Sequence, residues 1–132
     1  MLCGVDAIEI DEAQAPIFSV TVQRTPTAEE FAAYLAWQEH NLARQQRHVI
    51  IFELRRGANL ELAERLAGSD FTRKHSAAIA EQTAGFCFVF PNVAMRFIVS
   101  SALAFGPALF PYAVFAVHHD ALLWAQDQLE PQ

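Results

Sequence analysis

Cysteine is scarce in this chain, which contains only Cys3 and Cys87. Small secreted domains are held together by even sets of closely spaced cysteines, so a disulfide scaffold is excluded. Neither the basic region nor the apolar region that a signal peptidase recognises precedes Cys3. We therefore expect two free thiols and a cytoplasmic location.

Positive charge is also in short supply. Lys and Arg together number 9 against 15 Asp and Glu, which gives a formal net charge of −6. No basic cluster with interleaved aromatic residues offsets this excess of acid. Because such a chain would repel a phosphate backbone or an anionic bilayer, the composition argues against nucleic acid and anionic membrane surfaces as partners.

Long uninterrupted hydrophobic runs are missing, although hydrophobic residues make up 53% of the chain. The most apolar stretch, residues 86–117, is interrupted by Pro91, Arg96, Gly106, Pro107 and Pro111. Its pieces are too short to span a membrane as one helix. With 132 residues, of which 18% are charged, we expect one globular domain over 1–132 with loose ends at 1–4 and 130–132.

The sequence does contain a regular series of short strand patterns. Period-two alternation or short apolar runs predict strands at 5–10, 17–23, 49–54, 85–90 and 112–117. The run at 49–54 is apolar except for Glu53 and rich in β-branched residues, which is typical of a central strand that is buried on both faces.

Capping residues predict where the helices between these strands begin and end. Thr27 and Glu30 have the spacing of a capping box at the start of the first helix. The other predicted boundaries are N-caps at Asn59, Ser69 and Asn92, helix ends at Gly68 and Gly106, and a last helix over 121–129. Strands that alternate with helices predict an α/β fold: a single domain with one mixed sheet covered by about four helices.

The carboxyl-terminal half has a recognisable order of elements. It runs through a strand at Gly85–Phe90, a helix at Asn92–Phe105, a strand at Pro111–Phe115 and a closing Ala121-x-x-Trp124. This order resembles the end of bacterial STAS-like domains related to the SpoIIAA anti-sigma-factor antagonist, including small STAS/SEC14-like proteins. With the upstream elements the resemblance spans residues 5–129. It implies a SpoIIAA-like fold and a non-enzymatic regulatory or protein-interaction module of bacterial signalling.

In the regulatory members of that family, a serine in the loop after the central strand is phosphorylated, which changes docking to a partner kinase. The corresponding loop here, RRGANLELAERLAG at 55–68, contains no Ser or Thr. Ser69 is the first hydroxyl residue after this loop, and it is therefore the candidate phosphosite.

Several residues have reactive side chains, and each has a structural explanation. The cluster His-His-Asp at 118–120 follows a predicted strand, where neighbours point to opposite faces and an acid suits the first turn of the next helix. His75 lies on an apolar helix stripe, and Cys87 lies in a buried strand, which makes a thiol inert. His40 and His48 flank a polar connection, where we expect them to be solvated. We predict no catalytic residue, no metal ligand and no cofactor.

The helix predicted over 93–105 has more apolar surface than one side of a sheet needs, because only Arg96, Ser100 and Ser101 are polar. A neighbouring helix, a protein partner or second copy, or an apolar ligand could cover the surplus. The candidate interaction surface adjoins Ser69 and consists of Asp70, Arg96, Phe97 and Val99. The candidate lining of an apolar pocket is Phe97, Phe105, Phe110 and Phe115.

Three functional hypotheses follow. The first is a non-enzymatic STAS-like module that docks to another protein or to itself. The second is a carrier or sensor of a lipid or other apolar small molecule, which the SEC14 part of the family label implies; its mark would be a closed apolar cavity. The third is an enzyme, which only the dispersed histidines support.

Overall fold

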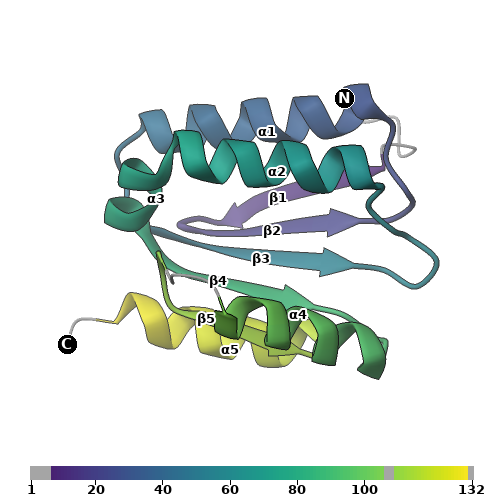
Figure 1. The fold of residues 1–132 in the computed structure, drawn as a ribbon. Helices are drawn as coiled ribbons and strands as arrows, with labels where there is room; N and C mark the ends of the chain where they lie inside the picture. Colours follow the sequence, from purple (N-terminus) through teal and green to yellow (C-terminus); the bar gives the residue numbers. More distant parts are fainter. Residues whose placement is uncertain (1–6, 106–108, 131–132) are drawn as a thin grey trace.

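The computed structural model describes residues 7–105 and 109–130, with the side chains of all of these except 102–105. Within this part of the chain, five strands form one sheet in the order β1-β2-β3-β4-β5 (Figure 1). The strands are β1 (Ile8–Gln14), β2 (Ile17–Val22), β3 (His48–Leu54), β4 (Thr83–Val89) and β5 (Tyr112–Phe115). β1 pairs antiparallel with β2, and the other neighbouring strands are parallel. The predicted α/β class and single mixed sheet are confirmed.

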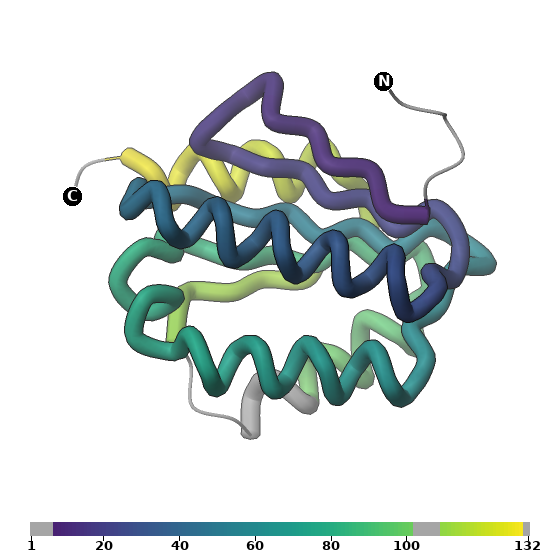
Figure 2. Tube along the Cα trace, turned by 90° about the horizontal axis from the view of Figure 1, so that it is seen from above, coloured from purple at the N-terminus to yellow at the C-terminus, as the bar shows by residue number. Residues whose placement is uncertain are grey.

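Two helices cross one face of this sheet and another helix crosses the opposite face (Figures 1 and 2). The helices are α1 (Ala28–Ala43), α2 (Leu62–Lys74), α3 (Ser76–Gln82), α4 (Val93–Phe105) and α5 (His118–Leu129). α1 and α2 lie side by side on the first face, and α3 continues from the end of α2. α4 contacts β5 at the edge of the sheet, while α5 packs on β3, β4 and β5 from the other side.

The first hydrophobic core lies between the sheet and the α1–α2 layer. Phe18, Val20 and Val22 alternate along β2 and are fully buried on this face, which confirms the period-two pattern. Phe31 and Tyr34 of α1 pack against them. Because β3 is covered on both sides, nearly every one of its residues is buried, as predicted for a central strand.

The second core lies on the α5 side. Ala121 and Ala125 of α5 are fully buried, and Trp124 packs beside them over β4. A Cβ atom on Gly85 would lie 2.7 Å from Cη2 of Trp124, closer than the two atoms can approach. Gly85 therefore leaves the space that the Trp124 ring occupies.

The capping box predicted at the start of α1 is present. The Thr27 hydroxyl accepts a hydrogen bond from the Glu30 backbone N–H at 3.1 Å, and the Glu30 carboxylate accepts one from the Thr27 N–H at 2.9 Å. Glu30 also forms a salt bridge with Arg24 at 2.8 Å. The carboxylate thus fixes the helix start to the loop that precedes it.

The predicted boundaries near α2 were wrong. α2 runs without a break through Gly68 and Ser69 and ends at Lys74, with His75 as its C-cap, so Ser69 lies inside the helix and is not an N-cap. A Cβ on Gly68 would lie 3.7 Å from Phe31, which shows that Gly68 faces α1 across the helix–helix contact and does not end α2. Asn59 precedes the helix, where its backbone N–H donates to the Thr25 hydroxyl. Two helices were predicted between β3 and β4, and the boundary between them lies at His75 instead of at Gly68 and Ser69.

Candidate functional site

A cavity of about 580 Å³ lies between α1, α2 and the face of the sheet that these helices cover, and it is partly open to solvent rather than closed as the carrier hypothesis expected. Ile50 and Phe52 of β3, with Phe86 and Phe88 of β4, form its floor. α1, α2 and the segment that leads into β5 supply the walls. Pockets that hold small molecules usually measure about 300–1,000 Å³ and are mostly apolar, so this cavity has the size of a ligand site.

Aromatic rings line the cavity continuously, and we call Tyr34, Phe52, Phe86, Phe88 and Phe110 the aromatic wall. The Phe52 ring centroid lies 5.9 Å from that of Tyr34 and 6.3 Å from that of Phe88. Phe110, which precedes β5, stacks on Phe86 at 5.5 Å. Rings at these separations attract one another in stacked or tilted geometry, so the wall is a preformed apolar surface.

The Tyr34 hydroxyl is the polar atom of the aromatic wall. Gln38, one turn further along α1, donates a hydrogen bond from its side-chain Nε2 to the Tyr34 Oη. Burial raises the pKa of Tyr34 above its usual value, because the charged phenolate would lose its hydration. Tyr34 therefore stays a neutral hydroxyl at physiological pH.

Three buried polar residues line one end of the cavity. Asn41 of α1 is 4% exposed, His48 at the start of β3 is 3% exposed and Thr83 at the start of β4 is 8% exposed. His48 and Thr83 are direct partners in the β3–β4 ladder. They meet because the carboxyl end of α1 leads into the amino end of β3, beside the amino end of the parallel strand β4. We call these three residues the polar end.

A carboxylate lies at the opposite end of the cavity. Glu64 belongs to the first turn of α2, which follows the carboxyl end of β3, and it is only 7% exposed. Its position in the first turn suits the helix dipole. Within the described residues it makes no side-chain hydrogen bond or ion pair, and it lines the cavity.

The residues of the predicted interaction surface lie on two separate helices, α2 and α4. Asp70 is exposed on α2 beside Ser69, and it forms an ion pair with Arg73. Arg96 is not a free surface cation, because its Nη1 donates to the Phe90 carbonyl at 2.6 Å. Phe97 points outward and is 74% exposed.

Val99, in contrast, packs inward against the first core. Phe97 belongs to an apolar surface that we call the α4 patch, namely Val93, Phe97 and Ile98, which are 70%, 74% and 61% exposed.

Among the described residues no helix has the length and apolar character needed to cross a bilayer.

The prediction of an apolar pocket named four phenylalanines, and one of them lines the cavity. Phe110 forms part of the aromatic wall. Phe97 faces outward on α4, and Phe115 packs on Trp124 in the second core with ring centroids 6.2 Å apart. The prediction does not hold for these two, because strand alternation and helix rotation turn them away from the α1–α2 layer. The side chain of Phe105 lies outside the described residues.

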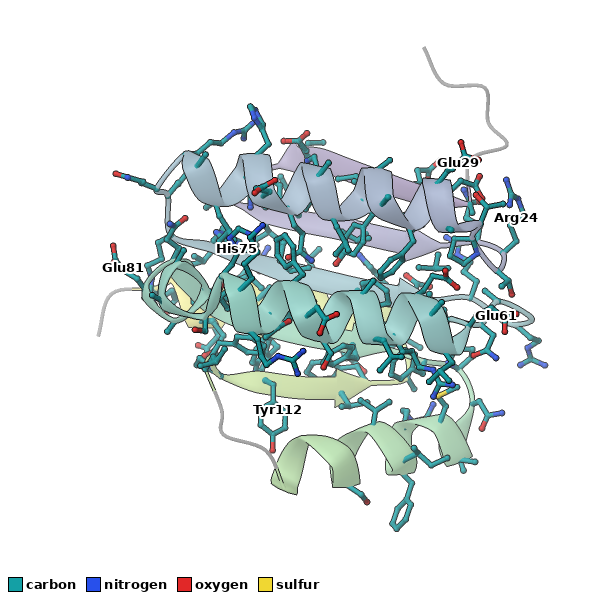
Figure 3. All side chains as sticks on the ribbon, turned by 45° about the horizontal axis from the view of Figure 1, so that its top comes forward. Arg24, Glu29, Glu61, His75, Glu81 and Tyr112 are labelled. Atoms are coloured by element: carbon teal, nitrogen blue, oxygen red, sulfur yellow. The ribbon has the colours of Figure 1, made fainter. Side chains whose placement is uncertain are left out.

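The reactive residues other than His48 lie where packing explains them. The 118–120 cluster is the first turn of α5, which begins earlier than predicted, and Nε2 of His118 contacts the Ser19 hydroxyl at 3.1 Å. The His75 ring packs on Phe71 at 4.4 Å, and Figure 3 shows His75 between α1 and α2. Burial raises the pKa of the Cys87 thiol to about 12. The described residues contain no group of three or more His, Cys, Asp or Glu that could hold a metal ion.

The burial of His48 and Asn41 in the lining of the cavity was not predicted from the sequence. The polar connection between α1 and β3 indicated a solvated His48, but the ring is buried and lies 5.9 Å from the Phe18 ring. The available signal was local: His48 directly precedes the apolar run of the central strand, and Asn41 falls one turn after Gln38 on the buried stripe of α1.

The fold and its cavity define a class of protein: a small α/β domain whose parallel strands carry one antiparallel edge strand, with a pocket under two helices. This chain is similar to the solved structure of an uncharacterised protein of the DUF3478 family from Shewanella loihica PV-4, which is described as having a SpoIIAA-like fold. The TM-score is 0.66 and the sequence identity is 19%, and the match covers 90% of this chain and 92% of that one. The chain therefore has a SpoIIAA-like fold, which confirms the fold implied by the resemblance. Neither a protein-family model nor a curated protein sequence matches the chain.

Proposed function

We propose that this protein is a non-enzymatic module that binds an apolar small molecule in the cavity between α1, α2 and the sheet, as a carrier or a sensor. The observation that carries the proposal is the cavity of about 580 Å³ with its aromatic wall. A ligand that covers this wall removes apolar surface from water, which is the main driving force for binding in such pockets.

The groups around the cavity support binding more than catalysis. Tyr34 is held in its protonated form, and its hydroxyl already accepts a bond from Gln38. The buried thiol, Cys87, lies in the second core on the opposite face of the sheet. His48 and Thr83 are ladder partners in the cavity lining, but no hydrogen bond joins the Thr83 hydroxyl to the His48 ring, so these described residues do not form the paired nucleophile and base that covalent catalysis requires.

The test is a pair of phenylalanine substitutions with the same chemical change. Phe110→Asp places a charge in the aromatic wall, whereas Phe97→Asp places the same charge on the outer side of α4. We expect the wild type and Phe97→Asp to bind the neutral dye Nile red with increased fluorescence, and Phe110→Asp to lose at least about tenfold in affinity. Native mass spectrometry of freshly purified protein should also show retained ligand mass in the first two proteins.

Equal dye binding by all three proteins, with unchanged circular dichroism spectra, would place the dye elsewhere and refute the cavity as a binding site. Phe110 is only half-buried and lies in the segment before β5, so its substitution should leave the sheet folded.

A second candidate function is a regulatory module that docks to a second copy of this chain through the α4 patch. The specific observation is that Val93, Phe97 and Ile98 are exposed, while the one charged side chain of α4, Arg96, is turned back to the Phe90 carbonyl. An uncharged patch can meet its own copy without like-charge repulsion, even on a chain with a net charge of −6.

Ser69 remains the candidate phosphosite of such a module. It is exposed and lines the cavity, so a phosphate there would place negative charge at the cavity rim.

A further inference from the structure

The polar end of the cavity holds hydrogen-bonding groups that the described part of the chain leaves unpaired. The side chains of Asn41, His48 and Thr83 are at least nine-tenths buried and line the cavity. Neither the Asn41 amide nor the Thr83 hydroxyl makes a side-chain hydrogen bond with another described residue. Among the described residues the fully buried side-chain atom without a partner is Gln82 Oε1, so the unpaired polar atoms of Asn41, His48 and Thr83 are open to the cavity, where a polar group of a ligand can bind them in place of water.

The state of His48 determines what that group must offer. Its Nδ1 lies 2.9 Å from the Gln46 carbonyl oxygen, which can only accept, so Nδ1 carries the proton. Burial lowers the pKa of His48 below its usual value, so the ring is neutral at physiological pH. Nε2 is then a hydrogen-bond acceptor, and within the described residues it has no donor. Its partner must be an O–H or N–H group.

The charges around the cavity argue against an ionised head group. Arg65, exposed on α2, is the cation among the described residues that line the cavity. Glu64 contributes a buried carboxylate. A carboxylate or phosphate at the polar end would lose its hydration without gaining a cation, and it would not donate to Nε2 of His48. An ammonium there would lose its hydration without a neighbouring anion, because the Glu64 carboxylate lies at the opposite end of the cavity.

We infer that the ligand is an uncharged amphiphile with a hydroxyl or primary amide head, which binds Asn41, His48 and Thr83, and an aliphatic tail, which lies along the aromatic wall. A water-sized group occupies roughly 30 Å³ in a liquid, so the cavity of about 580 Å³ accommodates on the order of 20 heavy atoms. This inference rests on the proposed function, because it assigns the head group for the same cavity.

The experiment compares two ligands that share a tail and differ in the head. Displacement of Nile red from the wild-type protein by 1-dodecanol and by dodecanoate is measured at about pH 8, where dodecanoate is ionised. We expect 1-dodecanol to bind at least about tenfold more tightly.

Two variants then test the polar end itself. Thr83→Val removes a hydroxyl and keeps the shape of the side chain, and Asn41→Leu removes the amide. We expect each variant to weaken 1-dodecanol binding by about threefold to tenfold while Nile red binding stays unchanged. Thr83→Val is the milder change and keeps the test valid if Asn41→Leu does not fold, which circular dichroism will show.

The outcomes separate the two proposals. If Nile red does not bind and neither dodecyl compound is retained, the proposed function fails and this inference fails with it. If Nile red binds and dodecanoate competes as well as 1-dodecanol, or if both variants keep wild-type affinity for 1-dodecanol, the cavity remains a ligand site and the assignment of an uncharged head is wrong.

Discussion

At the scale of single residues, Glu30 shows how one carboxylate can link stability to pH. The Arg24 side chain, followed by the backbone N–H groups of Thr27 and Ala7, holds the pKa of Glu30 at about 2, below the usual value of 4.5. Because the pKa is lower in the folded state, the unfolded chain binds more protons in acid. The contribution of Glu30 is therefore fully present above about pH 4.5 and is lost as the pH falls toward about 2.

Glu30→Gln tests this linkage. We expect a lower melting temperature than the wild type at neutral pH and a difference that narrows as the pH falls below about 4.5, because the wild-type carboxylate is then being protonated. Thermal unfolding followed by circular dichroism at a series of pH values measures this difference. Glu29→Gln is the matched control, since Glu29 is exposed in the same first turn of α1 (Figure 3). A constant difference across the acid range would contradict the assignment.

Whether the role of a residue could be predicted from the sequence depends on how far apart along the chain its interaction partners lie. The capping box joins residues three apart, so its spacing is visible in the sequence. His48 was predicted to be solvated because the residues before it are polar, but its ring is buried beside Phe18 and Thr83, which lie far away along the chain. The burial of His48 and Asn41 had a local signal in the sequence, whereas the pairing of His48 with Thr83 at the polar end could not be predicted from local patterns.

At the scale of elements, glycine is the residue that local patterns misjudged. Gly68 was predicted to end a helix, yet it lies inside α2 and faces Phe31 of α1. Gly85 was read as the first residue of a buried strand, and its role is to admit the Trp124 ring between α5 and β4. Both roles depend on which helix packs against the glycine, and periodicity within one element carries no such information.

The two glycines predict opposite responses to the same substitution. Gly85→Ala places a methyl group 2.7 Å from Trp124, and we expect a loss of about 1–3 kcal/mol in the free energy of unfolding as α5 is displaced. Gly68→Ala has room beside Phe31 and improves helix propensity, so we expect a gain of about 0.5–1 kcal/mol. Urea unfolding of both variants measures the two values. Equal stability of both variants would show that Trp124 does not occupy this space in solution.

At the scale of the whole molecule, the order of elements was enough to predict the architecture. Parallel strands need helical crossovers, so alternating strands and helices already required a sheet with helices on its faces. The cavity was not predictable in the same way. It exists because α1 and α2 stand far enough from β3 and β4 to leave space between aromatic side chains of both layers, and that spacing depends on packing across the whole domain.

The α4 patch leads to a prediction about assembly. If two copies meet through this patch, wild-type protein should elute with the mass of a dimer, twice 14.7 kDa, in chromatography coupled to light scattering. Phe97→Asp should shift it to the monomer mass, because two-fold symmetry would bring both unpaired carboxylates into the same apolar contact. Leu123→Asp makes the same kind of change on the exposed side of α5, where Leu123 is 53% exposed, and should leave the dimer intact. A wild type that stays monomeric at high concentration, or a Leu123→Asp variant that dissociates equally, would exclude the α4 patch as the contact between copies.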